Sequence, residues 1–524
     1  MTAVDPRLAS ALSPTADAGP GPGGGTVAVV SVPLADLPAV VSHLAGDGGA
    51  RLADVFASAA DGGADGTAGA GSRPVTLRLV WGVDASGRYL ITESVVDGDE
   101  YPPLSGLAPA AFYEECEMYE QHGIRPTGGE PLNRVVVPPH NGAGLPRLGR
   151  APAAGEAEAH APHVVGGGHA FEYPFGPVRQ AGMESLYYGL VTSGEEIVDL
   201  YMFTWHKHRG AEWRAQGMTP GQALFHIERV EGLGAVSGGW AFAAAAEMAL
   251  GITPPTGAAR TRAVALELER LYNHAAATAA LCQATGLAVG QAAAEIALER
   301  LLRVNAAAFG HRYLFGVIDI GGTRRGPDTG ALRRELPGAY GELKRAADAL
   351  LGTNSFLDRL EATGILTAAT AHRLGLVGPV ARACGLTGDS RADHPVEPYS
   401  AHPATVATGE GGDALARFRV MLAEAEDSVR LINGLLDAGA GPGQAPPEGG
   451  PASGWGLGWA ESSRGEALAY VALDRDGRVS RARLRPASAR NWRAFDDACR
   501  SQNVFTDVPI IEASFWLTVA GISR

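Results

Sequence analysis

The chain contains one short string of ionisable residues, His208-Arg209-Gly-Ala-Glu212, just before a long helical stretch. Arg209 can supply a fixed positive charge, because a guanidinium group stays protonated at physiological pH. Glu212 can relay protons if its carboxylate is partly buried. The alternative is structural: Arg209 and Glu212 pair with helix ends or with each other and only shape the fold. Glu231 is a further ionisable candidate, for which a solvated or ion-paired role is the alternative.

The cysteines and several histidines do not form a metal-binding pattern. The four cysteines lie far apart, so no pair has metal-ligand spacing, and a disulfide framework does not suit a chain of 524 residues. His169, His226, His274 and His311 are equally scattered along the chain. We therefore expect structural roles for these side chains, with the cysteines as small buried groups. They are Cys116, Cys282, Cys384, Cys499, His169, His226, His274 and His311.

Composition limits the compartment and the partners of the chain. The 57 acidic residues outnumber the 43 basic ones, and the resulting net charge of −14 argues against binding to nucleic acid. Residues 1–25 lack the pattern of a secretory signal, and no stretch of about 18 apolar residues occurs. No Gly-x-Gly-x-x-Gly motif starts a βαβ unit, which argues against a direct NAD site. We expect a cytoplasmic protein, which other subunits would have to hold in place if it works at a membrane.

The first part of the chain has a mixed α+β pattern. Residues 1–25 are rich in Pro and Gly and are expected to form a disordered leader. An α+β domain is predicted at 26–138, where 74–82 and 88–95 alternate apolar and polar residues around a turn sequence and so predict a β-hairpin. Residues 139–168, rich in Gly, Ala and Pro, are expected to be a linker.

The rest of the chain, 169–524, is predicted to be a mostly α-helical domain with peripheral β-ribbons. Helical character runs from 219 to about 310 and is broken at 253–257 by a Thr-Pro-Pro-Thr-Gly sequence. A second hairpin is expected around the Asp-Arg-Asp-Gly turn at 474–477. Residues 438–454 are again rich in Pro and Gly and are expected to form a flexible insertion.

Short motifs follow the His208–Glu212 string in a fixed order. They are Ile227-Glu-Arg229, Glu247–Ile252, Arg262, Leu266–His274, Gly375–Pro379, Arg382, Asp389-Ser-Arg391, Glu461–Glu466, Arg485–Ser488 and Asp507-Val-Pro509. Their order and spacing resemble the quinone-site large subunit of complex I and the large subunit of membrane-bound nickel–iron hydrogenases, which share one fold. The earlier segment Tyr101–Ile124 resembles the small complex I subunit that docks beside the large one. A fusion of the two is similar to formate hydrogenlyase-type large subunits.

The resemblance implies a nickel–iron centre, which the family holds with four thiolates from two Cys-x-x-Cys pairs. At the first pair this chain carries Glu231 and Gly234, and at the second it carries Thr518 and Gly521. Glycine has no side chain to coordinate a metal, and no other cysteine has the spacing to replace the missing ones. We therefore expect no nickel in this chain.

The resemblance also implies a quinone, whose carbonyl oxygens need proton donors. The family's His lies in a Gly-Pro-x-His loop, which here reads Phe175-Gly-Pro-Val-Arg179, and the family's Tyr position falls on Gly232. Arg179 can still donate a hydrogen bond. Other donors in the sequence are Tyr187, Tyr188 and His206. Arg179 and Glu231 are thus the residues expected at a quinone or redox cavity.

For the whole chain, the resemblance implies a subunit of a complex I-like redox assembly. A small iron–sulfur subunit would lie beside it, and integral membrane subunits would hold it at the cytoplasmic face of the membrane. In the family the His208–Glu212 string lies next to the redox centre and the partner's cluster, so His208, Arg209 and Glu212 are expected to take part in electron and coupled proton transfer. The alternative is a scaffold subunit that kept the fold and lost the redox chemistry.

Overall fold

The structure is a computed structural model that describes most of the chain. The described residues are 27–46, 49–59, 74–128, 132, 134–137, 148–149, 170–179, 184–445, 454–500 and 502–524. The leader expected at 1–25 lies outside them, as do most of the linker expected at 139–168 and residues 446–453 of the expected insertion.

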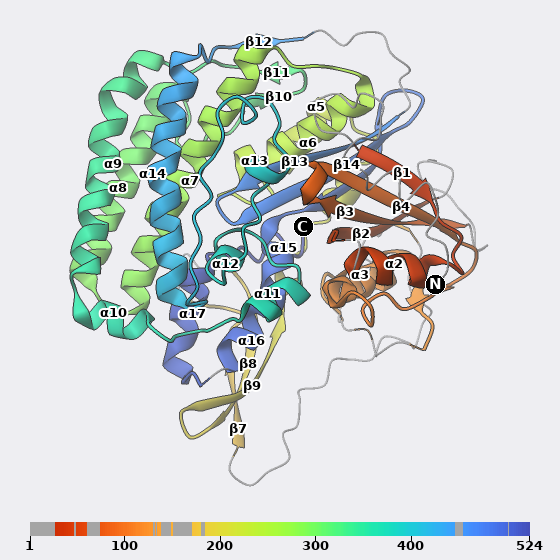
Figure 1. Ribbon diagram of the computed structural model, residues 1–524, viewed down its shortest axis with the longest axis horizontal. Coiled ribbons are helices and arrows are strands. Elements are labelled where there is room, and N and C mark those ends of the chain that lie inside the picture. Colours follow the sequence, from red (N-terminus) through yellow and green to blue (C-terminus); the bar gives the residue numbers. More distant parts are fainter. Residues whose placement is uncertain are drawn as a thin grey trace.

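The N-terminal region is built on a four-stranded sheet (Figure 1). Its strands are β1 (Val27–Ser31), β2 (Arg51–Ala59), β3 (Val75–Val83) and β4 (Arg88–Val96), in the spatial order β1-β4-β3-β2. β1 runs parallel to β4, and the other neighbours are antiparallel. The first predicted hairpin is confirmed as β3–β4, with Gly87 in the left-handed conformation (φ 67°) that glycine adopts without strain.

Successive side chains of these strands point to opposite faces of the sheet, and both faces are apolar. On one face, side chains such as Leu77 and Leu79 pack with α2 (Leu37–Ala45) and α3 (Phe112–His122). On the other face, Val80 and neighbouring side chains pack against strands that come from the C-terminal region. The N-terminal sheet is therefore covered on both sides.

The strands that cover it form a three-stranded antiparallel sheet, which consists of β13 (Trp455–Ser462), β14 (Gly465–Leu473) and β15 (Val479–Arg485). The second predicted hairpin is confirmed as β14–β15. The opposite face of this sheet lies on α6 (Ala235–Leu250). Gly456 and Gly458 permit the contact, because a Cβ at either position would overlap a backbone oxygen of α6. The middle of the molecule is thus layered as helices, sheet, sheet and helix.

Four long helices stand side by side beyond α6 (Figure 1). They are α7 (Thr256–Ala284), α8 (Ala288–Phe309), α9 (Thr329–Leu351) and α14 (Ala414–Asp437). The break predicted at 253–257 is confirmed: α6 has ended before it, and α7 begins at Thr256. α7 contacts α8, α14 and α6 and is buried along most of its length, so its polar side chains need partners inside the protein.

Shorter elements connect these layers. A three-stranded antiparallel sheet, which projects at the bottom of Figure 1, contains β7 (Ala170–Phe175), β8 (Tyr187–Ser193) and β9 (Glu196–Phe203). Small ribbons are β5 (Glu100–Tyr101) with β6 (Arg125–Pro126), and β10 (Ile318–Asp319) with β11 (Gly322–Thr323) and β12 (Gly443–Gln444). The short helices are α4 (Ala211–Ala215), α5 (Pro220–Ile227), α10 (Asn354–Leu360), α11 (Ala368–Arg373), α12 (Gly378–Arg382), α13 (Ser390–Asp393), α15 (Ala487–Asn491), α16 (Phe495–Arg500) and α17 (Val508–Phe515).

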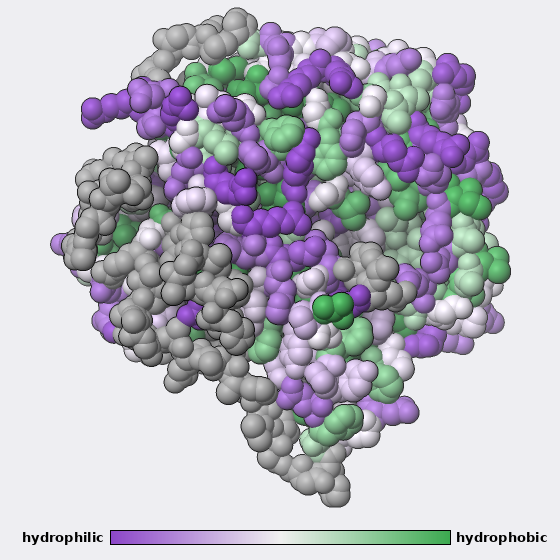
Figure 2. All heavy atoms as spheres, turned by 180° about the vertical axis from the view of Figure 1, so that it is seen from behind, coloured by the Kyte–Doolittle hydropathy of each residue, from purple (hydrophilic) through white to green (hydrophobic). Residues whose placement is uncertain are grey.

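The architecture agrees with the predicted class, an α+β region followed by a mostly helical region with small sheets. Within the described ranges, no helix combines the length and the apolar character needed to cross a membrane. On the rear face of the molecule, hydrophobic residues lie in small groups among hydrophilic ones (Figure 2). The C-terminus lies in the middle of the view in Figure 1, and Arg524 is buried.

Candidate functional site

The site is formed where the α5–α6 loop meets the last residues of the chain. α5 begins with a capping box at Thr219 and ends at Ile227, and α6 begins after Gly234. The C-terminal segment follows α17, and Trp516 ends that helix in the left-handed conformation (φ 52°). The loop and the C-terminal segment each contain one of the two pairs of positions at which the resemblance implies cysteine.

These four positions converge in the structure. The Thr518 hydroxyl donates a hydrogen bond to the carboxylate of Glu231 and lies 3.2 Å from the Ser488 hydroxyl. The Glu231 carboxylate fills the space beside the two glycines, because a Cβ at Gly521 would collide with it and a Cβ at Gly234 would lie 3.0 Å from it. The Glu231 carboxylate thus occupies the space between the positions at which the resemblance implies sulfur ligands. One carboxylate, one hydroxyl and two glycines do not supply the thiolates that a nickel–iron centre needs.

Two side chains tie the loop to the C-terminal segment. Asn273 on α7 donates to the Leu233 carbonyl at 2.9 Å and accepts from the Trp516 indole and from Arg464, each at 3.0 Å. Arg464, in the turn between β13 and β14, also donates to the Trp516 carbonyl at 2.5 Å. Both side chains are buried. They therefore hold the two halves of the site in a fixed relative position.

Glu212 is held by three arginines. Its carboxylate lies 2.8 Å from Arg481 and 2.7 Å from Arg524, and Arg483 follows at 3.9 Å. Burial alone would raise its pKa, but these guanidinium groups outweigh burial and hold the pKa of Glu212 well below its usual range. The carboxylate therefore stays ionised at neutral pH, which favours the structural interpretation over a proton relay.

His208 and Arg209 each contact one half of the site. The His208 Nδ1–H donates to the Ser523 carbonyl at 3.0 Å, which leaves Nε2 as the unprotonated nitrogen. Burial lowers the pKa of His208, so the ring is neutral at pH 7. The guanidinium of Arg209 is exposed and donates to the Arg229 and Val230 carbonyls at 3.1 and 3.2 Å. Arg209 thus fixes the start of the loop that carries Glu231.

Arg179 acts on the C-terminal segment through its neighbours. Its guanidinium donates to both oxygens of Glu512 on α17 at 2.8 Å and to the Glu184 carbonyl. The Glu184 carboxylate in turn accepts from the backbone N–H groups of Val519 and Ala520. Arg179 therefore supports the segment from outside and does not face Glu231 directly.

Two buried carboxylates flank the loop and have unusual acidity. Glu228 accepts from the backbone N–H of Gly316 at 3.2 Å, and Glu269 accepts from the first N–H groups of α6 at 2.7 and 3.1 Å. Burial raises the pKa of each to about 7, against the opposing effect of these hydrogen bonds. Both groups can bind or release a proton near neutral pH.

The free space beside Glu231 is small. A cavity of about 20 Å³ lies between the loop, α6 and the β14–β15 strands. That volume holds about one water molecule, and a quinone headgroup does not fit in it. Tyr188, one of the alternative proton donors, is buried in an aromatic stack with Phe175 and Phe495, whereas His206 is exposed.

All five residues predicted for the site contact the loop or the C-terminal segment, either directly or through one neighbour. The sequence analysis assigned no site role to Asn273, Arg464, Glu184 or the arginines of β15, although Asn273, Arg464 and Arg485 lie inside the quoted motifs. The sequence does contain one pattern that predicts β15 as a strand. Arg481, Arg483 and Arg485 alternate with Ala482 and Leu484, the pattern of a strand with one charged face.

Comparisons of the sequence with known proteins found a matching family model and several similar proteins. The family described as the 49 kDa subunit of respiratory-chain NADH dehydrogenase matches residues 294–446. Formate hydrogenlyase subunit 5 of Escherichia coli K12 is 28% identical over 79% of this chain and 75% of its own length. The carbon monoxide-induced hydrogenase of Rhodospirillum rubrum is 29% identical over 65% of this chain and 96% of its own length. An NADH-quinone oxidoreductase subunit of Streptomyces coelicolor is 29% identical over 63% of this chain and 88% of its own length.

The chain is similar to the large subunits of complex I and of related hydrogenases.

Proposed function

We propose that this chain is a subunit of a membrane-associated, complex I-like redox assembly that takes part in electron transfer and coupled proton transfer without a nickel site of its own. A small iron–sulfur subunit carries the electron-transfer cluster next to the His208–Glu212 string. Integral membrane subunits hold the assembly at the cytoplasmic face. The N-terminal region serves as the counterpart of the small docking subunit.

The observation that carries this proposal is the convergence of Glu231, Gly234, Thr518 and Gly521. These positions lie close together, and they carry a carboxylate hydrogen-bonded to a hydroxyl together with two glycines. The names of the relatives, which include a formate hydrogenlyase subunit and an NADH-quinone oxidoreductase subunit, support a role as one subunit of an assembly. The cavity of about 20 Å³ beside Glu231 is too small for a quinone headgroup, so we propose no quinone site within it.

A cluster of exposed aromatic and cationic side chains beside the site supports docking of the iron–sulfur partner. The Arg229 guanidinium lies 3.7 Å from the Phe225 ring centre and 5.0 Å from that of Phe315. Phe225 and Trp213 remain 49% and 42% exposed. Aromatic and arginine side chains contribute much of the binding energy in protein interfaces, so their exposure here fits a docking surface.

Affinity purification from the native host tests the docking role. The tagged chain is expected to bring down a small iron–sulfur protein and multi-span membrane proteins. R229E is expected to lower recovery of the iron–sulfur protein by about tenfold or more, as loss of an interface hot spot does. R345E, on the exposed surface of α9, is the matched control and should leave recovery unchanged. Equal recovery with R229E would contradict docking at this face.

A redox-inactive scaffold is the second candidate, favoured by the three arginines that hold Glu212 ionised. The two candidates differ in what Arg209→Ala does to the purified assembly. Direct participation predicts a clear loss of turnover with normal subunit content. A scaffold predicts unchanged turnover as long as the subunits remain together.

A further inference from the structure

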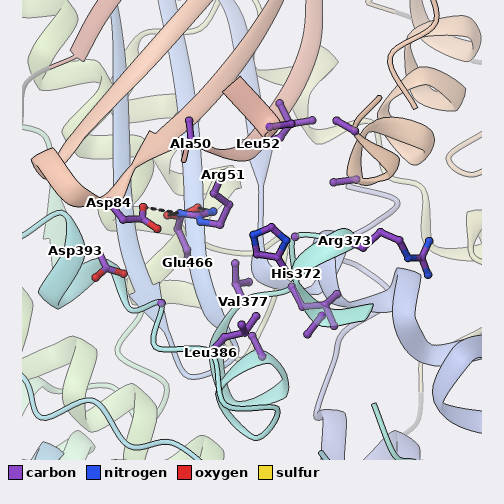
Figure 3. A pocket seen from close by; sticks show the side chains of 18 of the residues that line it. Ala50, Arg51, Leu52, Asp84, His372, Arg373, Val377, Leu386, Asp393 and Glu466 are labelled. Atoms are coloured by element: carbon purple, nitrogen blue, oxygen red, sulfur yellow. Dashed lines mark hydrogen bonds and ion pairs between the residues drawn. The ribbon is translucent and has the colours of Figure 1, made fainter. Parts of the chain in front are cut away.

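A large cavity lies between the N-terminal and C-terminal regions, away from the loop that carries Glu231. Its volume is about 510 Å³, and its walls come from β2, the turn after β3 and the segment from α11 to α13. Figure 3 shows Arg51 between Asp84 and Glu466 on one wall, with Asp393 on the same side as Asp84. Arg51 neutralises Glu466 at 2.7 Å. Three further residues that line this cavity are Asp389, Ser390 and Glu461.

Behind this wall is a cluster of buried charges, which we call the central ionic cluster. It joins α7, α12, α13, α14 and β13. Its side chains are all at most 1% exposed. Its members are Glu267, Arg270, His274, Arg382, Asp389, Arg391, Glu424 and Glu461.

The charges in this cluster do not balance. It contains four carboxylates and three guanidinium groups. His274 does not supply the missing positive charge, since burial lowers its pKa and, within the described part of the chain, its Nδ1 has no hydrogen-bond partner. The acidic groups on the cavity wall, Asp84 and Asp393, add no positive charge either. An unbalanced negative charge in the interior costs several kcal/mol, and a proton bound by one carboxylate removes that cost.

Glu461 is the carboxylate with the weakest compensation. Glu267 accepts from Arg270, Arg391, Tyr399 and Ser428, and Glu424 accepts from Arg270, Arg382 and His274. Asp389 is bound by Arg391 and lies 3.3 Å from Arg382. Glu461 has a single guanidinium contact, to Arg382 at 3.0 Å. Its other oxygen lies next to the Ser390 N–H and hydroxyl at 3.1 and 2.9 Å.

Ser390 makes a protonated Glu461 chemically reasonable. A hydroxyl can donate to a carboxylate or accept from a carboxylic acid by rotating its hydrogen. The Glu461–Ser390 contact can therefore persist in both protonation states. Burial and the adjacent Asp389 raise the pKa of Glu461 to about 7, against the attraction of Arg382, Arg270 and Arg391.

We propose that Glu461 is a proton-binding site, which holds a proton inside the central ionic cluster and exchanges it with water in the cavity between the two regions. The bound proton neutralises the cluster. The site lies in the same hairpin as Arg464, which binds both halves of the candidate site. This inference does not depend on the proposed partners, because it concerns groups within this chain alone.

Infrared spectroscopy of the purified full chain tests the proposal. We expect the C=O band of a protonated carboxylic acid at neutral pH, and E461Q should remove it. Because water in the cavity reaches Glu461, transfer into D₂O should shift the band without unfolding. A wild-type spectrum with no band that E461Q removes would overturn the proposal, and a band that D₂O leaves unshifted would overturn access through the cavity.

Two further variants test whether Glu461 is protonated because of the charge balance of the cluster or only because it is buried. E424Q removes one negative charge from the cluster, so Glu461 should then ionise at neutral pH and its band should disappear. E269Q, a change to a buried carboxylate outside the cluster, is the matched control and should leave the Glu461 band in place. Persistence of the band in E424Q would contradict the charge count.

Unfolding equilibria give an independent measure of the same proton. Because the folded pKa of Glu461 is raised, its contribution to stability is lost as the pH rises through the folded pKa. The unfolding constant of the wild type, divided by that of E461Q, should therefore rise about tenfold per pH unit between about pH 5 and pH 7 and then level off. A ratio that stays flat across this range would contradict protonation of Glu461.

Discussion

Glu212 and Glu461 are both buried carboxylates of the family motifs, yet their surroundings give them opposite acidities. Three arginines surround Glu212 and keep its pKa low, whereas Glu461 shares one arginine with other acids and has a raised pKa. The sequence could indicate that both residues belong to motifs. It could not indicate their acidity, because Arg481 and Arg524 lie 269 and 312 residues from Glu212 along the chain.

We predict that E212Q destabilises the protein. The change leaves Arg481 buried without its counter-charge and removes one of the two carboxylate partners of Arg524, so the free energy of unfolding should fall by about 3 kcal/mol or more in urea denaturation at pH 7. E335Q, on the exposed surface of α9, is the control and should change stability by less than about 0.5 kcal/mol. A similarly small effect of E212Q would contradict the structural role of Glu212.

The pH dependence of the same variant follows from the sign of its pKa shift. A carboxyl whose folded pKa is depressed stabilises the protein above its unfolded pKa, and this contribution is lost as the pH falls toward the folded pKa. The difference in stability between the wild type and E212Q should therefore shrink as the pH is lowered below about 4.5. Urea titrations at neutral and acidic pH measure this difference, and a constant difference would contradict the ion pairing.

At the scale of elements, the alternation of apolar and polar residues around turn sequences predicted the two hairpins. The sequence did not predict which distant segments pack against each other. β3–β4 and β14–β15 have clear alternation around turn residues, and both are present. β2 and β13 were not predicted. In β13, Gly456 and Gly458 lower the apparent strand propensity, but these glycines are needed because the strand lies directly on the α6 backbone. The sequence contains the glycines, but the helix that requires them is about 200 residues away.

We predict that G456A and G458A each lower the free energy of unfolding by about 1–3 kcal/mol, because the added Cβ overlaps a carbonyl of α6. G338A in α9 is the matched control. A Cβ there meets no atom within 4 Å, so the change should stabilise the helix by up to about 1 kcal/mol. Chemical denaturation measures all three variants. Equal effects at 456, 458 and 338 would mean that β13 does not lie on α6.

At the scale of the molecule, buried ion pairs join the N-terminal sheet and α3 to the C-terminal region. Arg483 on β15 binds Asp54 of β2 and Glu117 of α3, and Arg524 also binds Glu117. Because Arg524 and Arg481 bind Glu212 as well, the site and the junction between the regions share one charge network. Composition and motif order predicted two kinds of region, but only the structure shows that their junction lies behind the candidate site.

A double-mutant cycle with D54N and R483M should therefore reveal strong coupling. We expect a coupling energy above about 1.5 kcal/mol, as found for buried charge-assisted hydrogen bonds. Hydrogen exchange should become faster in β2 and α3 in each single variant. Coupling near zero would indicate that the two regions are held together by apolar contacts alone.

Metal analysis of the assembly purified through this chain tests the central proposal most directly. We predict iron and sulfide in the proportion of iron–sulfur clusters, contributed by a small co-purifying subunit, together with membrane subunits and only traces of nickel. Nickel in stoichiometric amount would contradict the proposal that Glu231, Gly234, Thr518 and Gly521 have replaced the metal site. A chain that purifies without an iron–sulfur subunit or a membrane subunit would contradict the proposed assembly.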